Sequence, residues 1–486
     1  MPFITAVDDN QRYDLILAGS GFASSFFLRE YLEHAPQDAR VLVVEMGRQY
    51  THDWRVANRM NSAEPSDSFF DYAGEDDFKW WMFTIGFGGS SNCWSGNTPR
   101  FLPADFELKT RYGVGQDWPI SYADLEPYYV KTEQWMAISG GNNGAVSPRS
   151  QPYPLPPHRL SDAHQRLADA YPEQFFPMPS ARPSAPSPGR RVCCSSGVCR
   201  ICPVDAKFTI DNAMMPVYED ARVSVLTRSQ VWQVVRESGR VVGVEVRSRE
   251  HEDQPGYEVR GDVVGLGANA IFNAAILLRS GFDNPHIGEK LHEQTSTGAE
   301  IFMKGVKNFN GSSKISGIGY MGWDGPHRSE AGACMIEAWN TGALRPEHGR
   351  WQEVMRVVMV VEDLPETRNR VRISSSGRPI ADFQGHSEYG EAGIRRAQKM
   401  LPEWMAALPV ERIAFETEKR RTDAHIQGTH AMGRSPADSV TDAEQRLHGH
   451  DNLYVLGSGS FSSCSPANPT LTLSALSVRS AARMFA

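Results

Sequence analysis

The pattern of apolar and polar residues predicts a strand, a glycine turn, a helix and a second strand near the start of the chain. Residues 13–18 form a short apolar run, residues 22–32 place apolar side chains at helical spacing, and residues 41–44 are apolar and largely β-branched. Apolar residues three and four positions apart predict a helix, whereas short β-branched runs predict strands. Glycines between the first two segments mark a tight turn.

The same kinds of pattern recur later in the chain. Residues 453–456 form an apolar run that leads through a glycine turn into a helical pattern at 470–484, and residues 388–407 have the pattern of an amphipathic helix. An apolar helix is also expected to end near Gly281. Further strands are predicted at residues 223–225, 231–235, 241–246 and 257–264, and within residues 297–385.

Strand–turn–helix patterns at both ends of the chain predict a discontinuous domain. Its N-terminal and C-terminal pieces would share one parallel sheet, and a mostly antiparallel section between them would form a second layer. The predicted fold class is α/β, or α+β when the whole chain is counted. The expected segments are residues 1–110, a proline-rich excursion at 111–190, and residues 191–295, 296–420 and 421–486.

The first glycine turn has the features of a dinucleotide-binding fingerprint. Gly19 permits a tight turn, Gly21 lets backbone N–H groups approach a pyrophosphate, and Ser24 is a small residue at the third position. Glu45 ends the next strand, which is the position where the acidic residue of the fingerprint hydrogen-bonds the ribose hydroxyls. Two further glycine runs, at residues 86–94 and 456–460, favour a long, extended ligand such as FAD over NAD.

Composition excludes some classes of protein. The chain has 486 residues, of which 40% are hydrophobic and 22% charged, with a net charge of −8, so a nucleic-acid-binding protein with a basic face is not expected. No apolar run reaches the roughly 20 residues needed to span a bilayer, and the N-terminus lacks a signal pattern. A cytoplasmic location is expected, or a periplasmic one reached by co-export with a partner that carries the signal.

Four of the seven cysteines lie within ten residues, in the segment CCSSGVCRICP. In a chain without an export signal, such clustering indicates metal or redox chemistry rather than disulfides. Short spacing and a following proline are typical of an iron–sulfur cluster held by thiolates. A structural zinc site and a loop of cysteines without any ligand remain open as alternatives. The candidate ligands are Cys193, Cys194, Cys199 and Cys202.

Motifs along most of the chain resemble those of the glucose–methanol–choline (GMC) oxidoreductase family. They are GGSSNCWSGNTPRF at 88–101, WPISYADLEPYY at 118–129, HIQGTHAMG at 425–433 and ANPTLTLSALSVR at 467–479. The likeness is greatest to the branch of pyranose 2-oxidase and the bacterial FAD-dependent sugar dehydrogenases. The resemblance implies a Rossmann-type FAD-binding domain, interrupted by a substrate domain built on an antiparallel sheet at residues 296–420.

The resemblance also implies a catalytic pair. In that branch the base is the histidine five residues before the histidine of the T-H-x-M-G motif, which is His425 here, and its partner is Asn468 of ANPTLT. A neutral imidazole would take the hydroxyl proton while the hydride passes to flavin N5. His430 is the alternative base, although the family uses that position for a structural residue.

The family pattern extends to the cofactor site. Where pyranose 2-oxidase has a histidine joined covalently to the flavin, this chain has Cys93, so non-covalent FAD is expected and a cysteinyl link is a lesser alternative. The expected cofactor-binding residues are Gly19, Gly21, Ser24, Glu45, Gly88, Gly89, Asn92, Cys93, Val231, Gly457, Ser458, Asn468 and Thr470.

The FAD subunits of bacterial sugar dehydrogenases carry a similar cysteine segment, and some hold a 3Fe–4S cluster there. This likeness implies such a cluster here, with Cys193, Cys199 and Cys202 as the expected ligands, although the last interval is one residue shorter than in the family. The predicted function is an FAD-dependent sugar or polyol dehydrogenase that passes electrons to a partner subunit, cytochrome or quinone. An oxidase that makes hydrogen peroxide without a cluster is the alternative.

Overall fold

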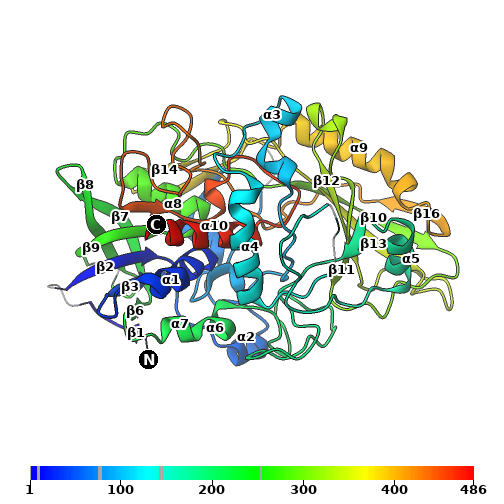
Figure 1. Ribbon diagram of the computed structural model, residues 1–486, viewed down its shortest axis with the longest axis horizontal. Coiled ribbons are helices and arrows are strands. Elements are labelled where there is room, and N and C mark those ends of the chain that lie inside the picture. The colour runs from blue at the N-terminus through cyan, green and yellow to red at the C-terminus, as the bar shows by residue number, and fades with distance from the viewer. Residues whose placement is uncertain are drawn as a thin grey trace.

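Two large sheets organise the molecule, one toward each end of its long axis (Figure 1). The structure is a computed structural model that describes residues 2–7, 11–74, 79–141, 144, 146–251 and 254–485. Residues 142, 143 and 145 of the expected excursion lie outside the described residues.

The first sheet joins segments from both ends of the chain, as the sequence predicts. Its strand order is β1-β6-β3-β2-β9-β8-β7, and β17 pairs with β9 beside β8. The strands are β1 Phe3–Ile4, β2 Arg12–Ala18, β3 Val41–Val44, β6 Val223–Leu226, β7 Ser229–Glu237, β8 Arg240–Ser248, β9 Tyr257–Leu266 and β17 Leu453–Val455.

Pairing within this sheet changes from parallel to antiparallel along its width. Strands β1, β6, β3, β2, β9 and β17 pair in parallel, but β7, β8 and the first half of β9 form an antiparallel meander. The expectation of a purely parallel sheet is therefore wrong at this edge. A tight turn at Ser238 and Gly239 joins β7 to β8, and short turns of this kind produce antiparallel neighbours.

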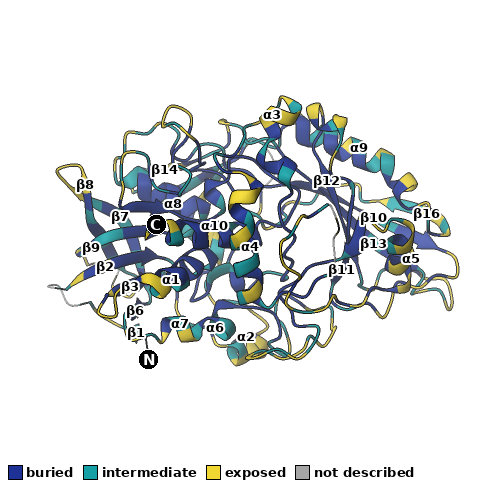
Figure 2. Ribbon diagram, viewed as in Figure 1, coloured by how far each residue is buried: buried dark blue, intermediate teal, exposed yellow. Residues whose placement is uncertain are grey.

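Helices cover the first sheet. α1 (Phe22–His34) packs against α10 (Thr470–Arg483), and α10 in turn packs against α4 (Tyr122–Met136). α8 (Asn269–Arg279) lies against β7. The apolar residues of α1 and α10 that face one another are buried, in agreement with their helical spacing (Figure 2).

The second sheet is antiparallel throughout. Its order is β16-β10-β13-β12-β11-β5, and α9 (Glu388–Trp404) contacts β10, β12 and β13. Its strands are β5 Phe175–Pro177, β10 Thr295–Met303, β11 Ile315–Gly322, β12 Cys334–Trp339, β13 Val354–Val361 and β16 Val410–Phe415. The fold is thus a mixed α/β architecture with a Rossmann-type sheet and a separate antiparallel sheet. This confirms the predicted fold class.

Shorter elements fill the space around the sheets. The remaining strands, β4 Asp71–Ala73, β14 Arg370–Ile373 and β15 Pro379–Asp382, form a small third sheet. The remaining α-helices are α2 His52–Asn58, α3 Leu108–Tyr112, α5 Asp162–Ala170, α6 Ile210–Ala213 and α7 Met215–Tyr218. Short 3-10 helices lie at Ser66–Phe69, Gly89–Ser91, Pro103–Phe106, Pro326–Ser329 and Ser458–Ser460.

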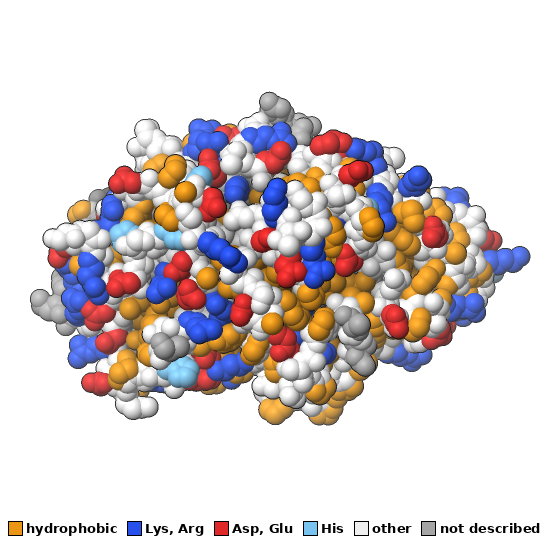
Figure 3. All heavy atoms as spheres, turned by 45° about the horizontal axis from the view of Figure 1, so that its top comes forward, with side chains coloured by type: hydrophobic (Ala, Val, Ile, Leu, Met, Phe, Trp, Pro, Cys, Tyr) orange, Lys and Arg blue, Asp and Glu red, His pale blue; other side chains and the backbone are white. Residues whose placement is uncertain are grey.

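The outer surface mixes charges of both signs with scattered hydrophobic side chains on the face that Figure 3 shows. Within the described residues, none of the helices combines the length and the apolar character that crossing a membrane requires.

Candidate active site

A cavity of about 380 Å³ opens where the two large sheets meet. One wall comes from the residues that follow strands β2, β3, β9 and β17, among them Gly19, Glu45 and Gly457. The opposite wall comes from β12 and β13, including Glu337 and Trp339. Ligands of parallel α/β sheets bind at the carboxyl ends of the strands, so the cavity lies where a dinucleotide is expected.

The first glycine turn connects β2 to α1 with two glycines that serve different purposes. Gly19 has φ of +84°, and a Cβ there would lie 3.0 Å from the carbonyl oxygen of Gly267, so the fold itself requires glycine. Gly21 has an ordinary φ of −74°, and a Cβ there would meet no atom of the protein within 4 Å. The open space beside Gly21 fits a ligand that approaches the N-terminus of α1, where backbone N–H groups and the helix dipole attract a pyrophosphate.

Glu45 directly follows β3 and lies in the cavity wall. Its carboxylate accepts hydrogen bonds from the Ser20 amide at 3.0 Å, the Ser20 hydroxyl at 2.6 Å and the Gly47 amide at 2.9 Å. Burial raises the pKa of the Glu45 carboxyl. The carboxylate lies in the cavity wall with acceptor capacity to spare, which fits the hydroxyls of a ribose.

The second glycine run packs directly on the first. A Cβ at Gly89, where φ is +51°, would lie 3.2 Å from the Cα of Gly21, so two backbones touch beside the cavity. The Gly88 amide donates to the Ser20 hydroxyl at 3.0 Å, which ties the two turns together. Cys93 follows in the cavity wall.

The expected cofactor residues divide into two groups. Ser24, Gly88 and Asn92 lie behind the wall: the Ser24 hydroxyl donates to the Ala18 carbonyl at 3.2 Å and the Asn92 amide to the Phe87 carbonyl at 2.9 Å. The residues that line the cavity are Gly19, Gly21, Glu45, Gly89, Cys93, Val231, Gly457, Ser458, Asn468 and Thr470. This set fits FAD, because glycine backbone and an acceptor for ribose hydroxyls lie along one wall of the cavity.

Replacing Gly21 with valine should abolish flavin binding while leaving the fold intact, because the new side chain would occupy ligand space and its Cβ would meet no atom of the protein within 4 Å. We expect flavin content per chain to fall at least tenfold, with little change in the melting temperature of the flavin-free protein. Gly342→Val is the matched control, since a Cβ at Gly342 would also meet no atom within 4 Å, yet this glycine lies outside the cavity wall. Full flavin content in Gly21→Val would contradict this placement of the ligand.

His425 and Asn468 come together in the cavity wall from distant parts of the chain. The Asn468 amide nitrogen lies 3.2 Å from Nε2 of His425, and Nδ1 of His425 lies 3.2 Å from Oε1 of Gln294. Desolvation in the cavity wall lowers the pKa of His425 to about 4. The imidazole is therefore neutral at physiological pH and able to accept a proton.

His430 is placed differently. It is fully buried, it lies outside the cavity wall, and its Nδ1 is 3.1 Å from the Thr429 hydroxyl. A Cβ at Gly459 would lie 1.9 Å from the ring, so the imidazole packs against the backbone of the third glycine run. These contacts fit a structural role in shaping the loop at residues 457–460.

The substrate side of the cavity contains polar residues that the sequence pattern alone does not single out. Glu337 is 5% exposed, and its carboxylate accepts from the Asn468 amide at 3.4 Å and from the Trp339 indole at 3.3 Å. Burial raises the pKa of Glu337. Lys314 and Arg420 also line this part of the cavity. A charged residue within the apolar strand β12 is the sequence signal that could have identified Glu337.

The cysteine segment forms a loop with one buried and several more exposed sulfurs. Cys199 is buried, Cys193 and Cys202 are partly exposed, and Cys194 is exposed. Burial, together with the charges of Cys199 and Cys202, raises the pKa of Cys193, so these three thiols lie close enough to interact electrostatically.

Basic residues surround Cys199. An Arg182 guanidinium N–H donates to its sulfur at 3.2 Å. Burial of Cys199 opposes ionisation, but the charges of Arg182 and Lys207 and nearby hydrogen bonds outweigh it and lower the pKa of the thiol. A buried thiol whose pKa is lowered by neighbouring positive charges is suited to ligate a metal or an iron–sulfur cluster.

Lys207 fastens the cysteine loop to the cofactor loop. Its ammonium group donates to the carbonyls of Asn92 at 2.8 Å, Trp94 at 2.9 Å and Arg200 at 3.1 Å. Arg200, which lies between Cys199 and Cys202 in sequence, itself lines the cavity. The cysteines therefore lie next to the cofactor site.

The cysteine sulfurs are not gathered as closely as the ligands of a single zinc ion would be. Four tetrahedral Zn–S bonds of about 2.3 Å bring the sulfurs to about 3.8 Å from one another. Among the described residues, no three of these cysteine sulfurs lie within 4.8 Å of one another.

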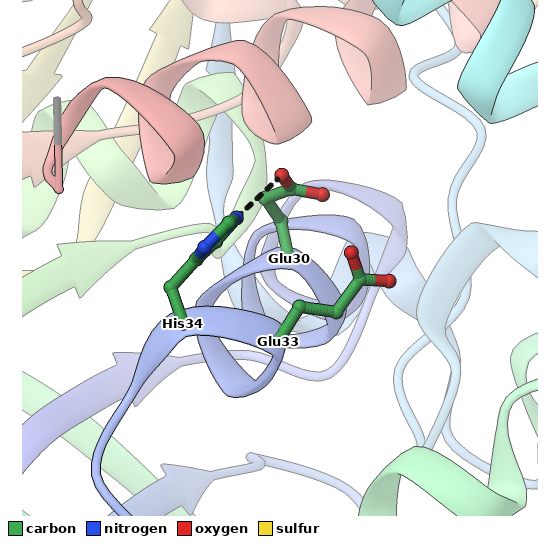
Figure 4. Close-up of side chains that lie close together, drawn as sticks. All are labelled: Glu30, Glu33 and His34. Atoms are coloured by element: carbon green, nitrogen blue, oxygen red, sulfur yellow. Dashed lines mark hydrogen bonds and ion pairs between the residues drawn. The ribbon is translucent and has the colours of Figure 1, made fainter.

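One surface group brings three possible cation ligands close together. Glu30, Glu33 and His34 project from α1 toward a common point (Figure 4). The Lys131 ammonium group already pairs with both carboxylates, so this group forms a surface ion-pair network.

Comparisons with known proteins agree with the fold and with a cavity suited to a dinucleotide cofactor. Residues 365–477 match the family model for GMC oxidoreductases. The chain is 26% identical to the fructose dehydrogenase large subunit of Gluconobacter japonicus over 96% of this chain and 97% of that protein. It is 25% identical to paromamine 6'-oxidase of Streptomyces fradiae over 98% of this chain and 91% of that protein.

Solved structures give the same picture of the fold. Pyridoxine 4-oxidase from Mesorbium loti superposes with a TM-score of 0.66 at 20% identity, covering 97% of this chain and 99% of that one. A formate oxidase superposes with a TM-score of 0.67 at 14% identity, covering 99% of each chain. The match of residues 365–477 to the GMC oxidoreductase model, and the similarity to the fructose dehydrogenase large subunit over nearly the whole chain, confirm the family resemblance of the motifs.

Proposed function

We propose that the protein is a dehydrogenase that oxidises a CH–OH group of a sugar or polyol. The observation that carries this proposal is the pair formed by His425 and Asn468, 3.2 Å apart, in the wall of the cavity that the glycine turns shape. A neutral imidazole beside a hydrogen-bonding amide is the apparatus that alcohol oxidation needs.

The residues of the chain divide the chemistry between them. When bound, FAD supplies the acceptor for the hydride that leaves the carbinol carbon. Nε2 of His425 takes the hydroxyl proton, and the Asn468 side chain hydrogen-bonds the substrate oxygen and holds it in line. The glycine turns at Gly21 and Gly89 and the Glu45 carboxylate would hold the cofactor. Lowering of the His425 pKa by desolvation keeps the base unprotonated at neutral pH.

Hydrogen-bond acceptors in the cavity support a polyhydroxy substrate. Nε2 of His425, the Glu337 carboxylate and Oδ1 of Asn468 all accept hydrogen bonds, and Oδ1 has no partner among the described residues. Several acceptors within one pocket are best satisfied by several O–H donors. Fructose dehydrogenase and paromamine 6'-oxidase, whose names refer to sugar substrates, are among the relatives.

Glu337 should contribute mainly to substrate binding. A charge-assisted hydrogen bond contributes about 1.5–3 kcal/mol, so Glu337→Gln should raise KM for a polyol about 10- to 100-fold, with a smaller change in kcat. Steady-state kinetics on the best substrate measures both constants. Glu300→Gln is the matched control, because Glu300 lies on β10 of the same sheet, with β13 between it and β12, and outside the cavity wall, so its replacement should leave KM unchanged. An unchanged KM in Glu337→Gln would contradict the role of this carboxylate.

The cysteine loop supports an electron acceptor other than dioxygen. We propose that Cys193, Cys199 and Cys202 hold an iron–sulfur cluster, with 3Fe–4S as the expected type, and that FAD is bound non-covalently. Such a cluster beside the cavity would carry single electrons toward a partner subunit, a cytochrome or a quinone. The match to a protein named as a large subunit supports a partner.

The alternative is an oxidase that passes its electrons to dioxygen and makes hydrogen peroxide. The names of several similar proteins, including 6'''-hydroxyparomomycin C oxidase of Streptomyces lividus, favour this alternative. The catalytic pair is the same in both proposals, and the electron acceptor distinguishes them.

One preparation tests both proposals. Protein purified without oxygen is examined by absorption spectroscopy, and its iron and acid-labile sulfide are assayed; it is then screened with sugars and polyols, using either an artificial electron acceptor or dioxygen. Flavin bands, about three irons per chain and activity with the artificial acceptor would support the dehydrogenase. Flavin without iron, together with peroxide formation, would favour the oxidase. Protein that folds without flavin would overturn both proposals.

A further inference from the structure

Gln294 links the two members of the catalytic pair. It lies immediately before β10 and is 1% exposed. Its amide nitrogen donates to the carbonyl oxygens of Ser465 at 2.7 Å and Ala467 at 2.8 Å, in the segment that leads to Asn468. Its Oε1 lies 3.2 Å from Nδ1 of His425.

These contacts leave the Gln294 amide a single orientation. Rotating the amide by half a turn would point its oxygen at two carbonyl oxygens, and none of these three atoms carries a hydrogen. The contact with Gln427 agrees with this orientation, because the Gln427 amide nitrogen donates to Oε1 of Gln294 at 3.3 Å. Oε1 therefore faces His425 and can only accept a hydrogen bond.

The orientation of the amide determines the tautomer of His425. Because Oε1 accepts, Nδ1 must carry the hydrogen, and the neutral ring then has its lone pair on Nε2. The Asn468 amide nitrogen donates to that lone pair at 3.2 Å and contacts the Glu337 carboxylate at 3.4 Å. Each bond in this series of hydrogen bonds is therefore fixed by the bond before it. The series begins at the backbone carbonyls of Ser465 and Ala467.

We infer that Gln294 is a positioning residue that fixes His425 as the Nδ1–H tautomer, so that Nε2 carries the lone pair that the Asn468 amide occupies and that a substrate hydroxyl takes over when it binds. The same side chain clamps the backbone before Asn468, so both members of the pair are aligned by one amide. This inference rests on the proposed function for its catalytic consequence, although the tautomer itself can be observed without turnover.

Charged groups around His425 determine how it responds to changes at Gln294. Glu293 accepts from the His425 backbone amide at 3.2 Å and pairs with the Lys79 ammonium group. Arg420 and Asp423 lie on the same loop as His425, and Glu337 lies across the cavity behind Asn468. Desolvation has the largest effect on the His425 pKa and lowers it, whereas the carboxylate of Glu293 raises it and the charge of Arg420 lowers it further.

Two substitutions of Gln294 separate positioning from packing. Gln294→Met keeps the shape but loses the acceptor, so it should lower kcat about 10- to 100-fold with little change in KM, because a misdirected base affects the reaction more than binding. Gln294→Glu adds a negative charge beside Nδ1, which stabilises the imidazolium. The acid limb of the kcat/KM profile should therefore move to higher pH.

Gln427→Met is the matched control. Gln427 is equally buried and contacts Gln294, but it makes no hydrogen bond to His425 among the described contacts. Its replacement should leave the acid limb in place. Melting temperature and flavin content of all three variants separate loss of positioning from loss of the fold.

The tautomer is read directly by ¹⁵N NMR of histidine-labelled holoenzyme, with His425→Asn identifying the resonances. A protonated Nδ1 and an unprotonated Nε2 in the wild type, together with a shifted acid limb in Gln294→Glu, are the expected results. A protonated Nε2, or wild-type kcat and pH profile in both Gln294 variants, would overturn the inference. If no sugar or polyol is oxidised, the proposed function fails, yet the NMR result still decides the tautomer.

Discussion

Replacing His425 with asparagine is expected to lower kcat by about 10²- to 10⁴-fold, which is the usual contribution of a general base. Nε2 of His425 carries the lone pair that takes the substrate proton, and asparagine offers no group of comparable basicity. KM should change much less than kcat, because the glycine turns, Glu337 and the remaining cavity wall stay in place. Anaerobic reduction of the bound flavin by substrate, followed by stopped-flow absorption, measures this step directly.

The matched comparison for this prediction is His430→Asn. The ring of His430 packs against Gly459 outside the cavity wall, so its loss should lower the melting temperature and flavin content rather than the rate of hydride transfer in the molecules that retain flavin. A variant of His430 that keeps flavin and fold but loses substrate reduction, with His425→Asn still active, would reverse the two assignments.

The pH dependence of the wild type follows from the same environment. Desolvation lowers the His425 pKa from its usual value near 6.5 to about 4, so the base is unprotonated over the whole neutral range. The kcat/KM profile should be flat above about pH 5 and fall as the pH drops through the pKa of the base.

Local patterns are sufficient to predict the parts of the fold that depend on neighbours in sequence. The spacing of apolar residues changes from that of a strand to that of a helix at Gly19 and Gly21, and the turn between β2 and α1 lies there. The cavity forms beside this turn, as the fingerprint predicts. The antiparallel edge made by β7 and β8 departs from the predicted parallel sheet. The turn at Gly239 that produces it is visible in the sequence, but the pattern of strands does not show which sheet the hairpin joins.

Residues that act through tertiary contacts are harder to predict. Gln294 reaches His425, which lies 131 positions along the chain, and nothing in its local pattern marks it. Glu337 is a polar residue in the apolar strand β12, a signal that is visible but ambiguous, because edge strands also carry such residues. Motif resemblance supplies His425 and Asn468, and the fold then brings them to hydrogen-bonding distance.

Replacing Cys199 with serine is expected to remove most of the iron from the protein. Cys199 is the buried member of the group, and Arg182 and Lys207 favour its thiolate form, whereas a serine hydroxyl stays protonated and binds iron weakly. Cys193→Ser and Cys202→Ser should behave in the same way. Iron and acid-labile sulfide per chain, measured on anaerobically purified protein, give the result.

Cys194→Ser is the matched control, because Cys194 is adjacent in sequence but exposed. Neighbouring residues in an extended segment direct their side chains to opposite sides, so Cys193 and Cys194 cannot both face the same cluster. Iron content should stay at the wild-type level in Cys194→Ser and fall at least fivefold in Cys199→Ser. Loss of iron in Cys194→Ser alone would exchange the roles of the two adjacent cysteines.

The activity of these variants separates the two electron paths. If the cluster carries electrons away from the flavin, Cys199→Ser should still reduce its own flavin with substrate, while transfer to a cytochrome or partner subunit should fall by at least tenfold. Lys207 holds the cysteine loop against Asn92 and Trp94, so the cavity should keep its shape when the cluster is lost. Equal rates of electron transfer in the wild type and Cys199→Ser would leave dioxygen as the acceptor and make the oxidase the better description.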